Sequence, residues 1–280
     1  MSRSSAPQAG SSFSLGFLFM TKERREALEA VYEFCRQVDD IVDSGALTSE
    51  QAAAELEAWR EEIRRVFESK PARALAVRLA SHVARFSLPR EAFDGLIDGV
   101  AMDLKHKRYE TYAELERYLY GVAGTVGLLC VEIFGHRATP PEDLRAYAVT
   151  MGNAFQLTNI MRDVGADLEN GRVYIPGEDL ERAGCGLDSF LRREHTPAFR
   201  AVMNMQYVRA KDSYRRAREL LAPADRPAQL PGAVMAAVYE DLLEVLRERE
   251  FRVFFEKASV PKGRRLVLAA KAWARAYGIY

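Results

Sequence analysis

Apolar side chains recur at helical spacing along almost the whole of the 280-residue chain. In residues 23–43 (ERREALEAVYEFCRQVDDIVD) and 232–257 they return every three or four positions, which is the period of one face of an α-helix. No segment alternates apolar and polar residues as a half-buried strand does. With 48% hydrophobic residues the chain can bury a large core. We therefore predict an all-α protein.

Capping patterns and turn residues divide this pattern into helices joined by short loops. Thr48 with Gln51, and Thr139 with Glu142, have the spacing of residues that begin a helix. The loops include no long linker, and no repeat of fixed period is present. We predict a single all-helical domain over residues 1–280, in which residues 1–11 are flexible.

Charge and cysteine content exclude several classes of function. Forty basic residues balance forty acidic ones, so net charge gives no reason to expect nucleic-acid binding. Three scattered cysteines without CxxC spacing predict neither a disulfide framework nor structural zinc. The first residues lack the apolar core of a signal peptide, and the uncharged run 118–131 is too short to span a bilayer. We expect a cytoplasmic protein that is soluble or peripheral to a membrane.

Three aspartates lie within five positions of the otherwise apolar helical segment 34–44, FCRQVDDIVDS. Asp39 and Asp43 are four residues apart, so their carboxylates lie on one face of a helix and repel each other. A solvated acidic helix end is one interpretation. The apolar neighbours Phe34 and Val38 favour another, in which this face turns toward a cavity and its carboxylates bind a hard cation such as Mg²⁺.

A second aspartate pair, Asp163 and Asp167, repeats this spacing in residues 153–176 (NAFQLTNIMRDVGADLENGRVYIP). Gln156 and Asn159 precede it at helical intervals, and such amides either satisfy a buried network or face a polar ligand. If the two aspartate helices face each other, the four carboxylates can hold several divalent cations. Mg²⁺ often bridges a few carboxylates to substrate phosphates, so we predict a site for a diphosphate.

The two DxxxD motifs, the second within QLTNIMRDVGAD and followed by GRVYIP, resemble the squalene/phytoene synthase family of head-to-head prenyl synthases. The resemblance runs from SSFSLGFLF through YLYGVAGTVG to the region around Tyr239. It implies a single-domain helical bundle of the class I isoprenoid synthase type, built around a central cavity. Within the family, the segments LPREAFDGLIDGVAMDL, HTPAFRAVM and QLPGAVMAAVYEDLL look most like the bacterial presqualene diphosphate synthases of hopanoid biosynthesis.

The resemblance implies a Mg²⁺-dependent prenyltransferase, with Mn²⁺ as a substitute, that condenses two farnesyl diphosphates to presqualene diphosphate and releases diphosphate. One allylic diphosphate ionises, the double bond of the second substrate attacks the resulting cation, and loss of a proton closes a cyclopropane. The sequence contains no dinucleotide-binding fingerprint, so we expect no nicotinamide cofactor.

The resemblance also implies roles for individual residues. The implied metal ligands are Asp39, Asp43, Asp163 and Asp167. The implied catalytic residues are Tyr32, Arg36, Tyr120, Arg162 and Tyr174. The implied substrate-binding residues are Ser12, Phe13, Arg36, Gln156, Asn159, Arg172, Tyr239 and Lys257. Arginine offers a planar fork to phosphate, and a tyrosine hydroxyl can donate a hydrogen bond beside an apolar chain.

Other functions remain alternatives. A phytoene synthase of the same family would use geranylgeranyl diphosphate, and a squalene or dehydrosqualene synthase would carry the farnesyl product further. The segment DDIVD at residues 39–43 also fits a head-to-tail prenyl synthase or a class I cyclase, but the second motif lacks a doubled aspartate. A non-catalytic helical assembly protein is a further alternative, although it would have no reason to keep two repelling aspartate pairs.

The segment GVAGTVG at residues 121–127 is rich in glycine but has neither the GxGxxG order nor a preceding strand of a nucleotide-binding loop. Small residues in a helix permit close approach of a neighbouring helix or a bulky ligand, at a cost of about 1 kcal/mol for each glycine. We predict that this segment forms a wall of the cavity against which prenyl chains lie.

The C-terminal residues 262–280 combine basic and apolar side chains without an acidic residue. The basic residues are Lys262, Arg264, Arg265, Lys271 and Arg275, and the large apolar ones are Leu266, Leu268, Trp273, Tyr277 and Ile279. One interpretation is a helix whose apolar stripe docks on the core while its basic face is solvated. The other is peripheral contact with the inner face of the cytoplasmic membrane, where a basic amphipathic helix binds anionic lipid.

Overall fold

The structure, a computed structural model, describes residues 20–105 and 107–279. Over these ranges the regular structure is helical, and extended chain pairs at the single isolated bridge between Arg108 and Val173. The prediction of an all-α fold is confirmed. The flexible segment predicted at residues 1–11 lies outside the described residues.

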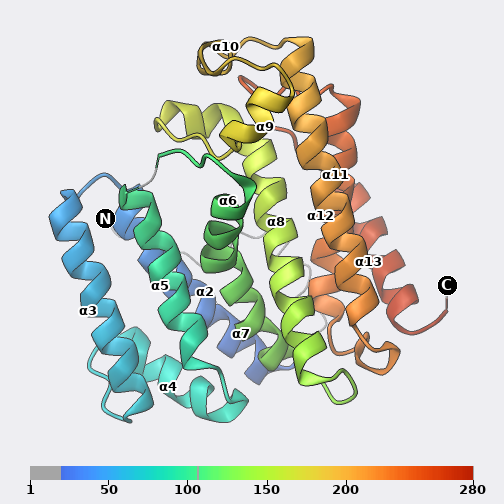
Figure 1. Cartoon of the computed structure of the whole chain (residues 1–280). Helices are drawn as coiled ribbons and strands as arrows, with labels where there is room; N and C mark the ends of the chain where they lie inside the picture. The colour runs from blue at the N-terminus through green and yellow to red at the C-terminus, as the bar shows by residue number, and fades with distance from the viewer. Residues whose placement is uncertain (1–19, 106, 280) are drawn as a thin grey trace.

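The helices form a bundle in which segments far apart in sequence lie side by side (Figure 1). The first part of the bundle comprises α2 (Lys22–Asp43), α3 (Ser49–Phe67), α4 (Ala74–Phe86) and α5 (Arg90–Lys105). The middle part comprises α6 (Tyr112–Leu119), the π-helix η2 (Tyr120–Gly124), α7 (Thr125–Phe134) and α8 (Pro141–Glu169). The last part comprises α9 (Gly177–Arg182), α10 (Leu187–Leu191), α11 (Pro197–Leu220), the 3-10 turn η3 (Pro223–Asp225), α12 (Leu230–Glu248) and α13 (Lys262–Ala276).

Helix α8 is the central element of the bundle. It is 29 residues long and packs against α6, η2, α7, α11 and α12 (Figure 1). Its buried side chains, among them Leu144, Tyr147, Leu157 and Met161, occupy more than one of its faces because neighbouring helices surround it. A residue on α8 can therefore face helices from both the middle and the last part of the chain.

Glycines allow α5, η2, α7 and α8 to approach one another closely. A Cβ atom on Gly121 would lie 2.6 Å from the Cα of Gly99, and a Cβ on Gly127 or Gly152 would collide with backbone of the facing helix. No side chain larger than hydrogen fits at these crossings. At residues 121–127 the small residues therefore permit close approach of neighbouring helices. The prediction that prenyl chains lie against this segment stays a prediction.

The continuous helical stretch Tyr112–Phe134, formed by α6, η2 and α7, is long and apolar enough to cross a membrane by length and composition. It contains the uncharged run that the sequence suggested was too short to span. Within its most apolar 18-residue segment, 56% is buried inside the protein, where the helix packs against α5 and α8. This packing accounts for its apolar character as that of a core helix.

Helices begin at both predicted starts, but only one of the two predicted side-chain caps is present. Thr48 and Gln51 form a capping box at the start of α3, as predicted. Thr139 does not cap α8, which begins after Pro140 without a side-chain cap. The backbone N–H and the hydroxyl of Thr139 donate instead to Asp225, at 2.7 and 2.6 Å. The buried Asp225 carboxylate requires donors, and Thr139 is one of the residues that supply them.

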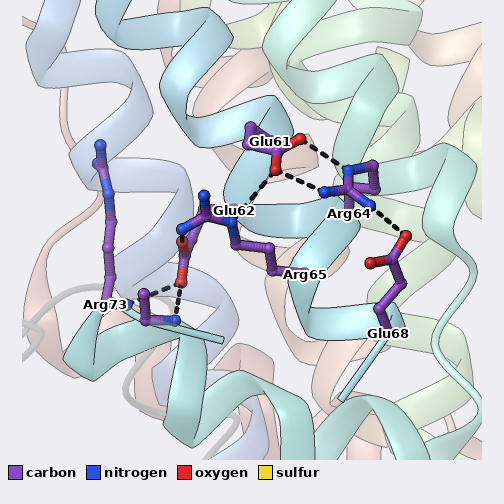
Figure 2. Close-up of polar contacts among 7 residues, drawn as sticks. Glu61, Glu62, Arg64, Arg65, Glu68 and Arg73 are labelled. Carbon is purple, nitrogen blue, oxygen red and sulfur yellow. Dashed lines mark hydrogen bonds and ion pairs between the residues drawn. The ribbon is translucent and has the colours of Figure 1, made fainter. Parts of the chain in front are cut away.

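The carboxylate of Glu62 on α3 fixes the start of α4. It accepts hydrogen bonds from the backbone N–H groups of Ala72 and Arg73, at 2.6 and 2.7 Å (Figure 2). These donors lie at the N-terminus of α4, where a helix leaves its N–H groups without intrahelical partners. Glu62 is only 3% exposed, whereas its neighbour Glu61 pairs with Arg64 and Arg65 at the surface (Figure 2).

The change Glu62→Ala should lower the free energy of unfolding by about 1 to 3 kcal/mol, because two partly buried N–H groups lose their charged acceptor. The matched change Glu61→Ala should lower it by clearly less, since it removes only exposed ion pairs. Urea unfolding followed by circular dichroism measures both values. Equal losses for the two variants would contradict the structural role of Glu62.

Candidate active site

A cavity of about 190 Å³ lies between α2, α5, α6 and α8. Asp39 and Asp43 line it from α2, and Asp163 and Asp167 line it from α8. The structure thus brings both predicted aspartate pairs, which are distant in sequence, to one site. The other polar residues that line the cavity are Asp103, Tyr118, Gln156, Asn159, Arg172 and Tyr174.

The aspartates reach this cavity because the helices that carry them are anchored by apolar side chains. On α2, Val31, Phe34 and Val38 are buried in the core, and Asp39 and Asp43 follow them in the last two turns of the helix. The Phe34 ring packs edge-on against aromatic rings of α3 and α5. This packing holds the carboxylates in place against their mutual repulsion.

Crowding shifts the pKa of two of these carboxyl groups upward. The Asp39 side chain reaches solvent, but many protein atoms surround its carboxyl group. This partial desolvation is the largest cause that raises its pKa to about 7, and the charge of Asp43 is the second. Burial and then the charge of Asp163 raise the pKa of Asp167 to about 7. In the absence of a cation, both groups therefore hold a proton close to neutral pH.

Asp163 differs from its neighbours because it already has cationic partners. Burial by itself would raise its pKa, but Arg162 and Lys257 outweigh this effect and hold the pKa below its ordinary value. The Nε of Arg162 donates to Oδ1 of Asp163 at 2.9 Å, and Nζ of Lys257 lies 3.0 Å from the same oxygen. Arg162 also hydrogen-bonds Tyr239 on α12.

Arg172 connects the two aspartate helices across the cavity. Its Nη1 donates to Oδ1 of Asp43 at 2.7 Å. The chain after α8 is held in place by the chain after α5, since the Val173 N–H donates to the carbonyl of Lys107 at 2.8 Å. This pairing, which includes the isolated bridge, directs Arg172 and Tyr174 toward the cavity.

Asp103 on α5 is a cavity residue that the sequence analysis missed. It accepts hydrogen bonds from the hydroxyls of Tyr118 and Tyr174, both at 3.0 Å, and the two rings stack with centroids 5.0 Å apart. The pKa of Asp103 is raised, and burial of its carboxyl group is the largest cause. One signal was present in the sequence: Asp103 follows the buried residues Leu96 and Val100 at helical spacing, so a carboxylate stands on the apolar face of α5.

Gln156 and Asn159 line the cavity as the sequence analysis expected of residues facing a ligand. The side-chain nitrogen of Asn159 donates to Oε1 of Gln156 at 3.3 Å. The Oδ1 atom of Asn159 is buried without a hydrogen-bond partner. A buried acceptor in this state is costly unless a ligand, a cation or water completes it.

Four predicted catalytic residues are not among those that line this cavity, namely Tyr32, Arg36, Tyr120 and Arg162, although Arg162 contacts the lining residue Asp163. Arg36 pairs with the exposed Asp40 at 3.7 Å, and the Tyr120 hydroxyl accepts a hydrogen bond from Arg145 at 3.3 Å. Residues two positions apart on a helix point away from each other, so the cavity receives Tyr118 from this helix instead of Tyr120. Ser12 and Phe13 lie outside the described residues.

The donor set of the cavity fits a divalent cation that is completed by a ligand. Across residues 20–105 and 107–279, no three His, Cys, Asp or Glu side chains converge closely enough to hold a metal alone. Pairs of carboxylates on separate helices suit Mg²⁺, which takes its remaining ligands from phosphate oxygens and water. A cation here would favour the ionised forms of Asp39 and Asp167, whose pKa values are raised, and could take the unpartnered oxygen of Asn159 as a ligand.

Comparison with known proteins agrees with this arrangement. Residues 6–265 match the squalene/phytoene synthase family. A chloroplastic phytoene synthase from Daucus carota is 35% identical over 268 residues, which cover 94% of this chain and 67% of that protein. The chain spans less than two thirds of the length of the phytoene synthases from Zea mays and an Oncidium hybrid, at 62% and 64%.

Two solved structures share the fold. A squalene synthase from Alicyclobacillus acidocaldarius is 31% identical with a TM-score of 0.76, and the match covers 85% of this chain and 89% of that one. A dehydrosqualene synthase in complex with a ligand is 27% identical with a TM-score of 0.85, and the match covers 97% and 93%. The protein therefore has the all-helical isoprenoid synthase fold, as the sequence predicted.

Asparagine substitutions of Asp39 and Asp163 should change stability in opposite directions in metal-free protein at pH above about 7. Asp39→Asn should raise the urea midpoint because it removes a repelled charge. Asp163→Asn should lower the free energy of unfolding by about 1 to 3 kcal/mol because Arg162 and Lys257 lose their charged partner. Shifts of the same sign in both variants would contradict the difference between the two carboxylates.

The stability of the metal-free protein should fall as pH rises from about 4 to about 7. Asp39 and Asp167 have folded-state pKa values raised from 3.8 to about 7, so the folded state binds their protons more tightly than the unfolded state does. This stabilisation is complete below the unfolded pKa and is lost as pH passes the folded pKa. Urea unfolding with a chelator at several pH values should therefore give a steeper fall for the natural protein than for the Asp39→Asn/Asp167→Asn double variant. Parallel curves would show that these carboxyl groups titrate normally.

Proposed function

The chain belongs to the squalene/phytoene synthase family of head-to-head prenyltransferases, and we propose that it condenses two prenyl diphosphates at a Mg²⁺-dependent site between α2 and α8. The observation that carries this proposal is the convergence of both aspartate pairs on one cavity. Mn²⁺ would substitute for Mg²⁺, and the reaction would need no nicotinamide cofactor.

Two substrates compete within this proposal. The names of the curated relatives support condensation of geranylgeranyl diphosphate to phytoene, which we take as the first candidate. The solved squalene and dehydrosqualene synthases, together with the sequence segments that resemble presqualene diphosphate synthases, support farnesyl diphosphate as the substrate. Both reactions place two diphosphates beside the same carboxylates.

The proposed metal ligands are Asp39, Asp43, Asp163 and Asp167. When bound, Mg²⁺ would supply the positive charge that neutralises a departing diphosphate. Arg162 and Lys257 lie on Asp163, and Arg172 lies on Asp43, so three cationic side chains surround the position where the diphosphate would bind. Guanidinium groups would bind its oxygens through paired N–H donors.

Asp103 would act by positioning tyrosine hydroxyls beside the reaction. Its carboxylate accepts from both Tyr118 and Tyr174, which fixes the directions of their O–H bonds. The Tyr109 ring stacks on the Tyr174 ring, and the two ring centroids are 5.9 Å apart. The packed rings of Tyr118 and Tyr174, which both line the cavity, would keep water from a carbocation.

The test is product analysis of the purified protein with Mg²⁺ and either geranylgeranyl or farnesyl diphosphate, each with and without NADPH. Phytoene from the longer substrate supports the first candidate. Presqualene diphosphate from farnesyl diphosphate, unchanged by NADPH, supports the second. If neither substrate releases diphosphate, the protein is not a prenyl synthase and the proposal fails.

The same assay should show that Asp39→Asn and Asp163→Asn each lower kcat by about 100-fold or more, because each removes a charge that acts on the leaving group. The matched control is Asp40→Asn. Asp40 lies on the same helix but is exposed outside the cavity, so its replacement should leave turnover within about twofold. Equal losses in Asp40→Asn and Asp39→Asn would remove the cavity as the site of chemistry.

A further inference from the structure

Helix α13 turns small residues toward the protein and large apolar residues outward. Ala269 and Ala272 are buried in a cluster with Leu230 and Val234 of α12. The exposed large residues of the terminal segment are Leu266 (58%), Val267 (55%), Trp273 (40%), Tyr277 (54%) and Ile279 (65%). The interpretation in which the large apolar stripe docks on the core is therefore wrong for Leu266, Trp273, Tyr277 and Ile279. Of the large apolar side chains in that predicted stripe, Leu268 alone is partly buried.

The outward side chains form an ordered stripe. Leu266, Ala270, Trp273 and Tyr277 follow one another at intervals of four, three and four residues, which places them on one face of the helix. The rings of Trp273 and Tyr277 lie 5.4 Å apart. Because α13 meets α12 through its alanines, α12 does not cover this stripe.

The charge of the helix indicates what kind of surface would cover the stripe. Five basic residues and no acidic residue lie within Lys262–Ala276. Arg264 pairs with Asp241 of α12 at 2.6 Å, and Arg265 donates to the carbonyl of Val260 at 2.7 Å. Lys262 is exposed on the same face as the stripe, and Lys271 is exposed four residues after the exposed Val267. Both have long alkyl stems that can lie along an apolar surface while their charges stay in water.

We propose that this face of α13 binds the headgroup layer of a membrane that contains anionic lipid. Tryptophan and tyrosine are well suited to this layer, because each combines an apolar ring with a hydrogen-bond donor. Leucine and valine would enter the acyl boundary, and the lysines would meet lipid phosphates. A second copy of the chain fits less well, since a two-fold contact through this face would bring the same basic residues together. The proposal stands on the helix face and does not depend on the proposed function.

The chain offers a direct probe because it contains two tryptophans, and the other, Trp59, is 2% exposed in the core. We expect the fluorescence of the full chain to shift to shorter wavelength when vesicles of phosphatidylcholine with phosphatidylglycerol are added, because Trp273 leaves water. Vesicles of phosphatidylcholine alone should give no shift. Trp273→Phe should abolish the shift while the protein still binds the vesicles.

Co-sedimentation with the same vesicles tests the two components of the face separately. Leu266→Gln/Trp273→Gln and Lys262→Gln/Lys271→Gln should each weaken binding at least about tenfold, and binding should decline as salt rises toward about 0.5 M. Val77→Gln is the matched control, since Val77 on α4 is 54% exposed far along the chain from α13. All changes are at exposed positions, so urea midpoints should stay close to that of the natural protein.

Several outcomes would overturn the proposal. One is equal binding to neutral and anionic vesicles, and another is binding that both double variants retain. A third is a protein that does not bind vesicles but forms a dimer in light scattering, and whose dimer dissociates in the Leu266→Gln/Trp273→Gln variant. In that case the face would be an interface between two copies of the chain. Absence of both binding and dimerisation would also exclude a membrane contact.

Discussion

Repulsion among carboxylates is the constraint around which this structure is arranged. Asp39 of α2, Asp103 of α5 and Asp167 of α8 reach one cavity, and the pKa of each is raised because burial and neighbouring negative charge disfavour ionisation. Their helices are held by apolar packing away from the cavity, such as that of Phe34 against α3 and α5. The core therefore keeps these charges together, and the cavity is a region of negative potential that cations would complement.

Nearby cationic side chains neutralise some of the cavity aspartates but not others. Asp163 is paired with Arg162 and Lys257, and Asp43 is paired with Arg172, whereas Asp39 and Asp167 hold raised pKa values. If cations occupied the carboxylates, these arginine and lysine side chains would lose their present partners. They would then be free to bind the oxygens of a diphosphate in the same space. In the proposed function, the ion pairs of the cavity would thus hold these side chains in place before a diphosphate arrives.

The parts of the site that the sequence could predict are those with a local signature. A spacing of four residues places Asp39 and Asp43 on one helix face wherever that helix lies. Asp103 has no such signature, because its role comes from the hydroxyls of Tyr118 and Tyr174, which reach it from α6 and from the chain after α8. The choice of Tyr118 over Tyr120 at the cavity likewise depends on how that helix is rotated against α5 and α8.

The sequence by itself determined that the chain is helical, where one of its capped helices begins and that two aspartate pairs exist, since each follows from the geometry of a single helix. Only the tertiary structure decided which face of each helix is buried. On α13 the sequence pattern allowed the large apolar side chains to face the core. Ala269 and Ala272 are buried there instead, against Leu230 and Val234 of α12. Small side chains let two helix backbones approach closely, and that fit depends on a partner surface more than twenty residues away, which no local pattern specifies.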